Sequence, residues 1–390
     1  MKTNVNYYIV NIVSFNFFNL LIYIIRDIIL VVIFMFQDVE EKRQKHNQIL
    51  FSRSSLCLQN LLYFMRQCTH QELLLWALSF AKEILLLLES IYPDETRFRT
   101  AYQKTLALTK GEIKMPEVKR AILDCHAVAK KLQNSSHIAL CHALGQGLST
   151  VHVETHAIGL CIYELTAIVF KHPTDYVPIV SERVQEYIDR LFSIHENFSF
   201  FCGQFGIPTF VPFLEKDVTN REQVLLHRRF QKRIVSSSIY DVLEQLSIPY
   251  QEVKHEPVYT VEDAKSIPIE ISGIGVKNLF LKDASNHYFL YLLEDDKRAD
   301  LKSLAKFLHT SHLHFGSEEE LQNTLHLSRG SCTPFGIISD DENVVVVILS
   351  ELLLSKKLLF HPNRNDRTIS ISSYDLIRFI EAEGHVYLIY

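Results

Sequence analysis

The first half of the chain carries hydrophobic residues at intervals of three and four positions. In "ELLLWALSFAKEILLLLESI", Leu73, Trp76 and Phe80 share one face, and Lys82 and Glu83 fall between them. This spacing is typical of amphipathic helices. Further helices are expected over residues 98–110, 115–132, 136–170 and 180–192. The pattern predicts an all-α bundle over residues 65–198.

After residue 236 the pattern changes to short apolar runs that alternate with short helices. Strands are expected in "YQEVKH", "VKNLFLKD", "HYFLYLLED", "LHF", "PFGIIS", "NVVVVILS", "KLLFHP" and "TISIS". Helices are expected in "YDVLEQLSI", "RADLKSLAKFL", "SEEELQNTL" and "SYDLIRFIEAEG". Residues 199–235 are predicted to be a linker, with a loop in "FCGQFGIPTFVPF" and a basic helix in "NREQVLLHRRFQKR". The predicted class is an α+β multidomain protein, a helical bundle followed by a mixed α/β domain over 236–390.

Residues 1–64 allow two interpretations. The stretch from Thr3 to Ile25 has no charged residue, and the apolar run resumes after Asp27 as far as Phe36. Its length suits a membrane anchor through residues 3–36. Alternatively, translation begins at Met65, residues 1–64 are absent, and the protein is cytoplasmic. A membrane is a partner only in the first case.

Composition narrows the class further. Hydrophobic residues make up 47% and charged residues 22%, so the chain can bury real cores, and the net charge of −5 is unlike that of a nucleic-acid coat protein. The seven cysteines form no CxxC pair, which indicates reduced thiols rather than disulfides.

Five histidines fall between residues 126 and 156. In "HVETH", His152 and His156 are spaced to share one helix face, and a metal site there is a weak candidate. The acid, Glu154, is expected to point away from that face. The ordinary alternative is that these histidines are interior residues bonded to carbonyls. The expectation is therefore no metal and no cofactor.

Three segments of the C-terminal part could surround one pocket. They supply Lys277 in "GVKNLFLKD", the loop "RGSCTPFG", and His361 in "FHPNRND". Taken singly, none of these residues indicates a site. Lysine is common on surfaces, glycine and proline are common in turns, and a histidine can end a strand. Together they offer backbone N–H donors and one cation, with no acid pair, Ser–His–acid order or metal set. Such groups suit an ester carbonyl and its developing oxyanion, with a water activated by the substrate itself.

From Tyr240 onward, the order of these motifs resembles the ProX/PrdX branch of the YbaK-type aminoacyl-tRNA deacylases. The resemblance implies a hydrolase that acts in trans on mischarged tRNA, above all alanine on proline tRNA, and so serves translation fidelity. It assigns the essential lysine to Lys277, an amino-acid pocket position to Asn278, and the pocket histidine to His361. The loop that holds the acyl ester and the terminal adenosine corresponds to Gly330, Ser331, Cys332, Thr333 and Pro334. Cys332 stands where valine is usual.

Residues 68–171 resemble the family named "putative immunity protein". The positions that carry this resemblance are Trp76, Asp94, Arg97, Arg99, His126, His152, His156 and Gly159, with Phe98 where the family usually has proline. The resemblance implies a helical binding module. It supports an alternative function, in which the chain is a non-catalytic protein whose helical domain recognises a protein partner.

Contacts with the tRNA body are expected from basic side chains. The candidates are Lys297, Arg298 and Lys302, together with Arg228 and Arg229 in a segment that also holds Arg221, Lys232 and Arg233. The alternative is that this segment is a solvated helix face.

Overall fold

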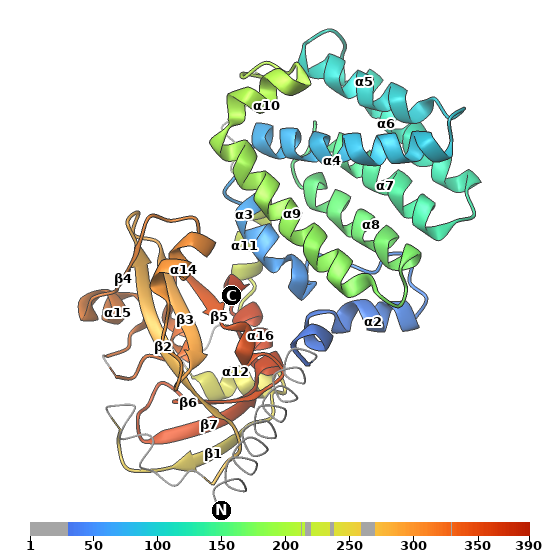
Figure 1. The fold of residues 1–390 in the computed structure, drawn as a ribbon. Coiled ribbons are helices and arrows are strands. Elements are labelled where there is room, and N and C mark those ends of the chain that lie inside the picture. Colours follow the sequence, from blue (N-terminus) through green and yellow to red (C-terminus); the bar gives the residue numbers. More distant parts are fainter. Residues whose placement is uncertain (1–29, 212, 215–219, 235–237, 259–269, 329) are drawn as a thin grey trace, which may run out of the picture. The chain divides into compact units, whose positions relative to one another are not determined.

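The computed structural model describes residues 30–211, 213–214, 220–234, 238–258, 270–328 and 330–390 (Figure 1). The chain divides into a helical unit, residues 36–229, and a mixed unit made of residues 230–390 together with the described residues 30–35. This confirms the α+β multidomain class. No helix in these ranges is long and apolar enough to cross a membrane. Most of the candidate anchor, residues 3–29, lies outside the described residues.

The helical unit is built around one long apolar helix. Its elements are α2 (Gln37–Gln44), η1 (Leu56–Leu58), α3 (Gln59–Met65), α4 (His70–Ile91), α5 (Arg97–Thr109), α6 (Met115–Val128), η2 (Ala129–Lys131), α7 (Ser135–Ser149), α8 (His156–Lys171), α9 (Tyr176–Glu196), α10 (Phe198–Phe205) and α11 (Arg221–Phe230). Helix α4 begins with a capping box between Thr69 and Glu72 and contacts α5, α7, α8, α9 and α10 (Figure 1). Trp76 and Phe80 on α4 are fully buried.

The helix predicted over residues 136–170 was wrong in its middle. It is two helices, α7 and α8, separated by turns over residues 150–155. This stretch contains Thr150, Val151, Val153 and Thr155. Such β-branched residues lose side-chain freedom in a helix, which favours a break. His152 therefore lies in a turn and does not share a helix with His156.

Two further predictions were wrong. The loop expected in "FCGQFGIPTFVPF" begins with α10, which ends where Gly206 adopts φ +61°. The strand expected in "PFGIIS" is a 3₁₀ helix, η3 (Pro334–Ser339). Pro334 starts it, because a proline lacks the N–H that a helix leaves unused in its first turn.

Residues 36–64 belong to the helical unit, although the sequence placed its boundary at Met65. Leu50, Phe51, Leu58, Leu61 and Leu62 are at most 2% exposed. The backbone N–H of Leu50 donates to Thr166 Oγ1 on α8 at 3.1 Å. The hydrophobic pattern did not reveal this segment, because the polar helix α2 and a loop precede it.

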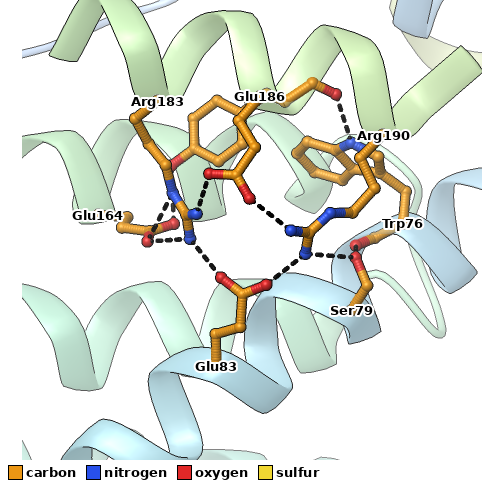
Figure 2. Close-up of polar contacts among 8 residues, drawn as sticks. Trp76, Ser79, Glu83, Glu164, Arg183, Glu186 and Arg190 are labelled. Atoms are coloured by element: carbon orange, nitrogen blue, oxygen red, sulfur yellow. Dashed lines mark hydrogen bonds and ion pairs between the residues drawn. The ribbon is translucent and has the colours of Figure 1, made fainter. Parts of the chain in front are cut away.

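A buried ion-pair network ties α4, α8 and α9 together (Figure 2). Arg183 contacts Glu164 at 2.6 Å and Glu83 at 3.0 Å, and its guanidinium lies 4.6 Å from the ring centre of Phe80. Glu164 also accepts from the Tyr187 hydroxyl at 2.7 Å, and burial raises its pKa. Arg190 extends the network to Glu83 at 2.5 Å. Each buried charge therefore has a partner, as burial requires.

The mixed unit is an eight-stranded sheet with flanking helices. Its strands are β1 (Gln251–Lys254), β2 (Ile274–Asp283), β3 (Tyr288–Glu294), β4 (Leu313–Phe315), β5 (Val345–Leu349), β6 (Lys357–Phe360), β7 (Arg367–Ser372) and β8 (Tyr387–Ile389), in the order β1-β7-β6-β2-β3-β5-β8 with β4 on β2. Its helices are α12 (Ile239–Gln245), α14 (Leu301–Phe307), α15 (Glu318–Leu325), η3, η4 (Glu351–Leu353) and α16 (Ser373–Ala382). The predicted β2–β3 hairpin and the Ser317–Glu320 capping box are confirmed.

One edge of β2 is shared by two short neighbours. Near its start β2 pairs with β6 through Ile274–Leu358 and Gly275–Leu359, and near its end it pairs with β4 over residues 281–283. The opposite edge pairs with β3. Residues 276–279 lie between the two short ladders, so this stretch of the edge is open to another segment. Lys277 and Asn278 are in it.

Residues 36–64 can be tested with two chains shortened at native methionines, one beginning at Met35 and one at Met65. The Met65 chain lacks the five buried side chains above, each worth about 1.5–3 kcal/mol, against a typical domain stability of about 5–15 kcal/mol. We expect the Met35 chain to keep a cooperative unfolding transition of its helices in circular dichroism and the Met65 chain to lose it. Equal transitions would contradict the assignment of residues 36–64 to this unit.

The ion-pair network predicts a large effect of Arg183→Met. This change leaves Glu164 buried without its cation, and the loss of a single partner from such a pair costs about 3–5 kcal/mol. The control is Arg99→Met, which breaks the more exposed pair with Glu89 and should cost about 0–1 kcal/mol. Urea unfolding of both variants measures the difference, and similar midpoints would show that the network is not stabilising.

Candidate active site

The loop predicted to hold the ester docks at the open stretch of β2. Asn278 Nδ2 donates to the backbone oxygen of Cys332 at 3.0 Å. Next to it, Lys277 Nζ donates to the backbone oxygen of Asp295 at 3.2 Å. An ammonium has three donors, so this contact leaves two for a ligand. The structure thus joins Asn278 to the loop, whereas the contact of Lys277, the preceding residue on the strand, is with Asp295.

The loop itself has a defined backbone. Gly330 adopts φ +87°, a conformation that costs glycine little and other residues more. The Ser331 N–H donates to Ser328 O at 3.1 Å, which closes a turn. Thr333 is fully buried, and Pro334 then starts η3. Phe335, which follows, packs edge-on against Phe360 and Phe379, so the loop is anchored in the core of the unit.

A second asparagine holds the loop from the other side. Asn363 Nδ2 donates to the backbone oxygen of Phe335 at 3.2 Å. Asn363 adopts φ +57°, which asparagine tolerates better than most residues. The sequence analysis quoted "FHPNRND" but did not single out Asn363. The signal that could have found it is an asparagine just after a strand and a proline, where left-handed turns are common.

His361 follows β6 directly. Its Nδ1 donates to the backbone oxygen of Arg367 at 2.8 Å, because a carbonyl can only accept. Burial lowers the pKa of His361, and the nearby His255 ring, 5.7 Å away between centres, acts in the same direction. His361 is therefore neutral at neutral pH, with Nε2 as an acceptor.

Three buried polar atoms of these segments lack a partner within the described part of the chain. They are Asn278 Oδ1, Thr333 Oγ1 and Asn363 Oδ1. Each belongs to the loop or to an asparagine that holds it. Leaving a buried polar atom unpaired costs about 1–3 kcal/mol, so such atoms are rare unless a ligand or water pairs with them. All three belong to the segments in which the sequence predicts the site.

Burial also affects Cys332, the residue that stands in the loop in place of the usual valine. It raises the pKa of the thiol to about 12, so Cys332 is uncharged and acts as a small apolar side chain.

The predicted tRNA contacts are scattered. Lys297, Arg298 and Lys302 are exposed on the mixed unit, but Lys297 lies within 4 Å of Glu294 and Asp296. Arg228 and Arg229 are exposed on α11 of the helical unit. Arg233, by contrast, is half-buried and paired with Asp341 at 2.6 Å.

The histidines of the helical unit form polar pairs. His126 Nδ1 lies 3.0 Å from His142 Nδ1, and His156 Nδ1 lies 2.6 Å from Gln146 Oε1. Gly145 and Gly159 leave the room that the His126 ring and the Gln146 side chain occupy. Glu154, expected to point away, caps α11 by accepting from the Arg221 N–H at 2.7 Å. Within the described ranges no three His, Cys, Asp or Glu side chains are placed to hold a metal ion.

Two parts of the chain match known protein families. Residues 255–379 match the family model described as "Aminoacyl-tRNA editing domain", and residues 64–191 match "Imm-5 like putative immunity protein". The chain is 36% identical over 147 residues to prolyl-tRNA editing protein ProX of Acetoanaerobium sticklandii, which is 37% of this chain and 90% of that protein. It is 32% identical over 148 residues to prolyl-tRNA synthetase associated domain-containing protein 1 of mouse, 37% of this chain and 88% of that protein.

Through its C-terminal part the chain belongs to the aminoacyl-tRNA editing family, and it is an aminoacyl-tRNA deacylase whose substrate is mischarged tRNA. Within that family its similarity is to the ProX type, as the motifs predicted. The match of residues 64–191 likewise bears out the immunity-protein resemblance of the helical unit and extends it beyond residues 68–171.

The role of Asn363 in holding the loop can be tested by hydrogen exchange. Asn363→Ala removes the donor to Phe335 O, so the amides of Cys332, Thr333, Phe335 and Gly336 should exchange faster, by roughly fivefold for a bond worth about 1 kcal/mol. The matched control is Asn365→Ala in the same segment, because Asn365 Nδ2 donates instead to Val258 O at 3.2 Å. Unchanged protection in the Asn363 variant, or an equal change in both, would contradict this role.

Proposed function

We propose that the chain releases alanine from mischarged proline tRNA in trans, at a site formed by Lys277, Asn278, the loop from Gly330 to Pro334, and His361. The observation that carries this proposal is the group of unpaired buried acceptors where Asn278 and Asn363 hold the loop. An aminoacyl ester presents an α-ammonium group and ribose hydroxyls, which are the donors that such acceptors lack.

The site stabilises the charge that develops on the ester oxygen. The amides of Gly330, Cys332 and Thr333 are the loop's candidate donors, because that of Ser331 is already used in its turn. In this proposal the Lys277 ammonium, whose contact in the structure is with Asp295 O at 3.2 Å, turns one of its other donors toward the ester and adds a positive charge. Donors fixed in place before the reaction need no reorganisation, and each typically contributes 10²–10³-fold to the rate.

The nucleophile is a water that the substrate itself assists. The titratable side chains of the proposed site are Lys277, Cys332 and His361. The Cys332 thiol stays protonated because burial raises its pKa to about 12. His361 is neutral and held through Nδ1, so it forms a polar wall rather than a relay with an acid. The 2′-hydroxyl or 3′-hydroxyl of the terminal adenosine next to the ester is the group that can orient the water.

The amino acid is selected by size. A pocket that admits the alanine methyl group excludes the larger proline ring by steric overlap, which discriminates better than attraction does, since one methylene contributes only about 1–3 kcal/mol. Cys332 and the buried Thr333 lie in the loop that limits the space.

Contacts with the tRNA body come from exposed cations. On the mixed unit the candidates are Arg298 and Lys302, with Lys297 partly neutralised by Glu294 and Asp296. On the helical unit they are Arg228 and Arg229.

The decisive experiment uses the full chain with alanine-charged and proline-charged proline tRNA. Alanine should be released and proline retained, and Lys277→Ala should reduce alanine release by about 10²-fold or more. The control is Lys282→Ala on the same strand, because Lys282 pairs with Glu320 at 2.6 Å and belongs to no part of the proposed site. It should keep nearly full activity.

Two outcomes would contradict the proposal in different ways. Equal release of proline would contradict selection of the amino acid by size but would leave the assignment of the active site unaffected. No release from either tRNA, or loss of release in the Lys282 variant alone, would sink the site itself. In that case the rival function, in which the helical unit recognises a protein partner, would become the better account.

A further inference from the structure

A glycine of strand β2 leaves the space that the side chain of Asp295 occupies. Gly275 lies one position before the Val276–Glu294 pair of the β2–β3 ladder, and the Asp295 N–H donates to Gly275 O at 3.0 Å. A Cβ atom on Gly275 would stand 2.5 Å from Asp295 Oδ2 and 2.8 Å from its Cγ, so the carboxyl group lies directly over this glycine. Glycine weakens the interior of a strand and often marks the close approach of another group. Here that group is a carboxylate.

The Asp295 carboxylate lies on the same face of the sheet as Lys277. Side chains alternate along a strand, so residues 275 and 277 face the same side, and residues opposite each other on paired strands share that side as well. Lys277 leans toward Asp295, since its Nζ donates to Asp295 O at 3.2 Å. This contact uses the backbone oxygen of Asp295 and leaves the carboxylate oxygens to other donors. An ammonium and a carboxylate are therefore close neighbours at the site.

The acids on either side of Asp295 face lysines. Glu294 pairs with Lys356 at 2.7 Å, and Asp296 lies 3.8 Å from Lys297. Asp295 is instead half-buried over a residue that has no side chain. Its two oxygens offer about four acceptor sites, so they can take a further donor beside the contacts that Asp295 already makes. The donor that suits a carboxylate best is a cation, because charge-assisted hydrogen bonds are about twice as strong as neutral ones.

We propose that the Asp295 carboxylate binds the α-ammonium group of the aminoacyl ester, which makes Asp295 a specificity-determining residue of this deacylase. The inference rests on the proposed function, in which Lys277 turns a donor toward the ester oxygen. In an aminoacyl ester, the carbon atoms that carry the ammonium group and the carbonyl oxygen are bonded to each other. The protein groups that bind these two must therefore be close neighbours, as Lys277 and Asp295 are.

Two points of attachment orient the amino acid. With the ester oxygen at Lys277 and the ammonium group at Asp295, the α-carbon can place its side chain in one direction only, and the size filter acts on that side chain. The neutral acceptors Asn278 Oδ1, Thr333 Oγ1 and Asn363 Oδ1 then serve the hydroxyl groups of the terminal ribose. The site thus distinguishes an α-amino acid from other acids of the same size.

The test compares two esters of proline tRNA that differ in one group. The alanyl ester carries the α-ammonium group, and nitrous acid converts it into the lactyl ester, in which a hydroxyl replaces the ammonium group while the methyl group and the ester remain. Asp295→Asn in the full chain keeps the size of the side chain and removes its charge. It should lower kcat/KM for the alanyl ester roughly tenfold to a hundredfold, as expected for a hydrogen bond to a charged group, and kcat/KM for the lactyl ester by less than about threefold. Each variant is compared with the wild type on the same ester, so the different intrinsic reactivities of the two esters cancel.

The matched control is Asp296→Asn, which removes the same charge one residue further along the chain. It should change kcat/KM for either ester by less than about twofold, because Asp296 is exposed and its contact is with Lys297 at 3.8 Å. Gly275→Ala is an independent variant, since its added methyl group displaces the Asp295 carboxyl group. It should lower kcat/KM for the alanyl ester and spare the lactyl ester, as Asp295→Asn does. Retained activity on the lactyl ester also shows that each variant is folded.

The outcomes distinguish this inference from the proposed function. Equal losses on both esters in Asp295→Asn, or no loss on the alanyl ester, would overturn binding of the ammonium group by Asp295. Lys277→Ala should lower kcat/KM for both esters, because the ester oxygen is common to them. If it lowered neither while Asp295→Asn affected the alanyl ester alone, the role of Lys277 would be wrong and the ammonium site would stand. Release of neither acid by the wild-type chain would overturn the proposed function and this inference together.

Discussion

The two hydrogen bonds that hold the loop at residues 332–335 are the constraint on which the site depends. Asn278 from β2 and Asn363 from the segment after β6 both donate to backbone oxygens of the loop, and Phe335 anchors it against Phe360 and Phe379. A loop whose carbonyls are fixed has fixed amides as well, because each peptide is planar. The sheet therefore positions backbone donors without using a reactive side chain, and it can do so because β2 leaves residues 276–279 open between β6 and β4.

The side-chain amides of Asn278 and Asn363 use their nitrogen atoms to hold the loop, and their oxygen atoms stay without a partner among the described residues. Asn278 Oδ1 and Asn363 Oδ1 are buried and unpaired among the described residues because each side chain spends its nitrogen on the loop, and Thr333 Oγ1 adds a third such acceptor. An apolar residue at these positions would avoid this cost but could not hold the loop. The same side chains thus provide stability to the loop and binding capacity to the pocket. A ligand that brings hydrogen-bond donors offsets the cost of burying these oxygen atoms without partners.

The sequence predicted the parts of this structure that follow from local pattern. The spacing in α4, the β2–β3 hairpin and the Ser317–Glu320 capping box could all be predicted because each depends on residues a few positions apart. Lys277 and the loop could be predicted through the family resemblance. The break before His156 and the 3₁₀ helix at Pro334 have local causes, the β-branched residues at 150–155 and the proline, but the hydrophobic pattern alone did not separate them from a continuous helix and a strand. The packing of residues 50–62 could not be predicted, because tertiary contacts decide it. Asn363 was missed for the same reason, since its partner, Phe335, is 28 positions away in the sequence.

The site can recognise an amino acid but has little with which to hold a tRNA. Its polar groups suit one aminoacyl ester and the adenosine beside it, and a size filter contributes nothing to affinity for the rest of the nucleic acid. Affinity for tRNA comes mainly from phosphate contacts. On the mixed unit Lys297 faces Glu294 and Asp296, which cancel much of its charge. Arg298 and Lys302 are the exposed cations with which this unit can contact phosphates, and contacts from Arg228 on the helical unit would add to its affinity.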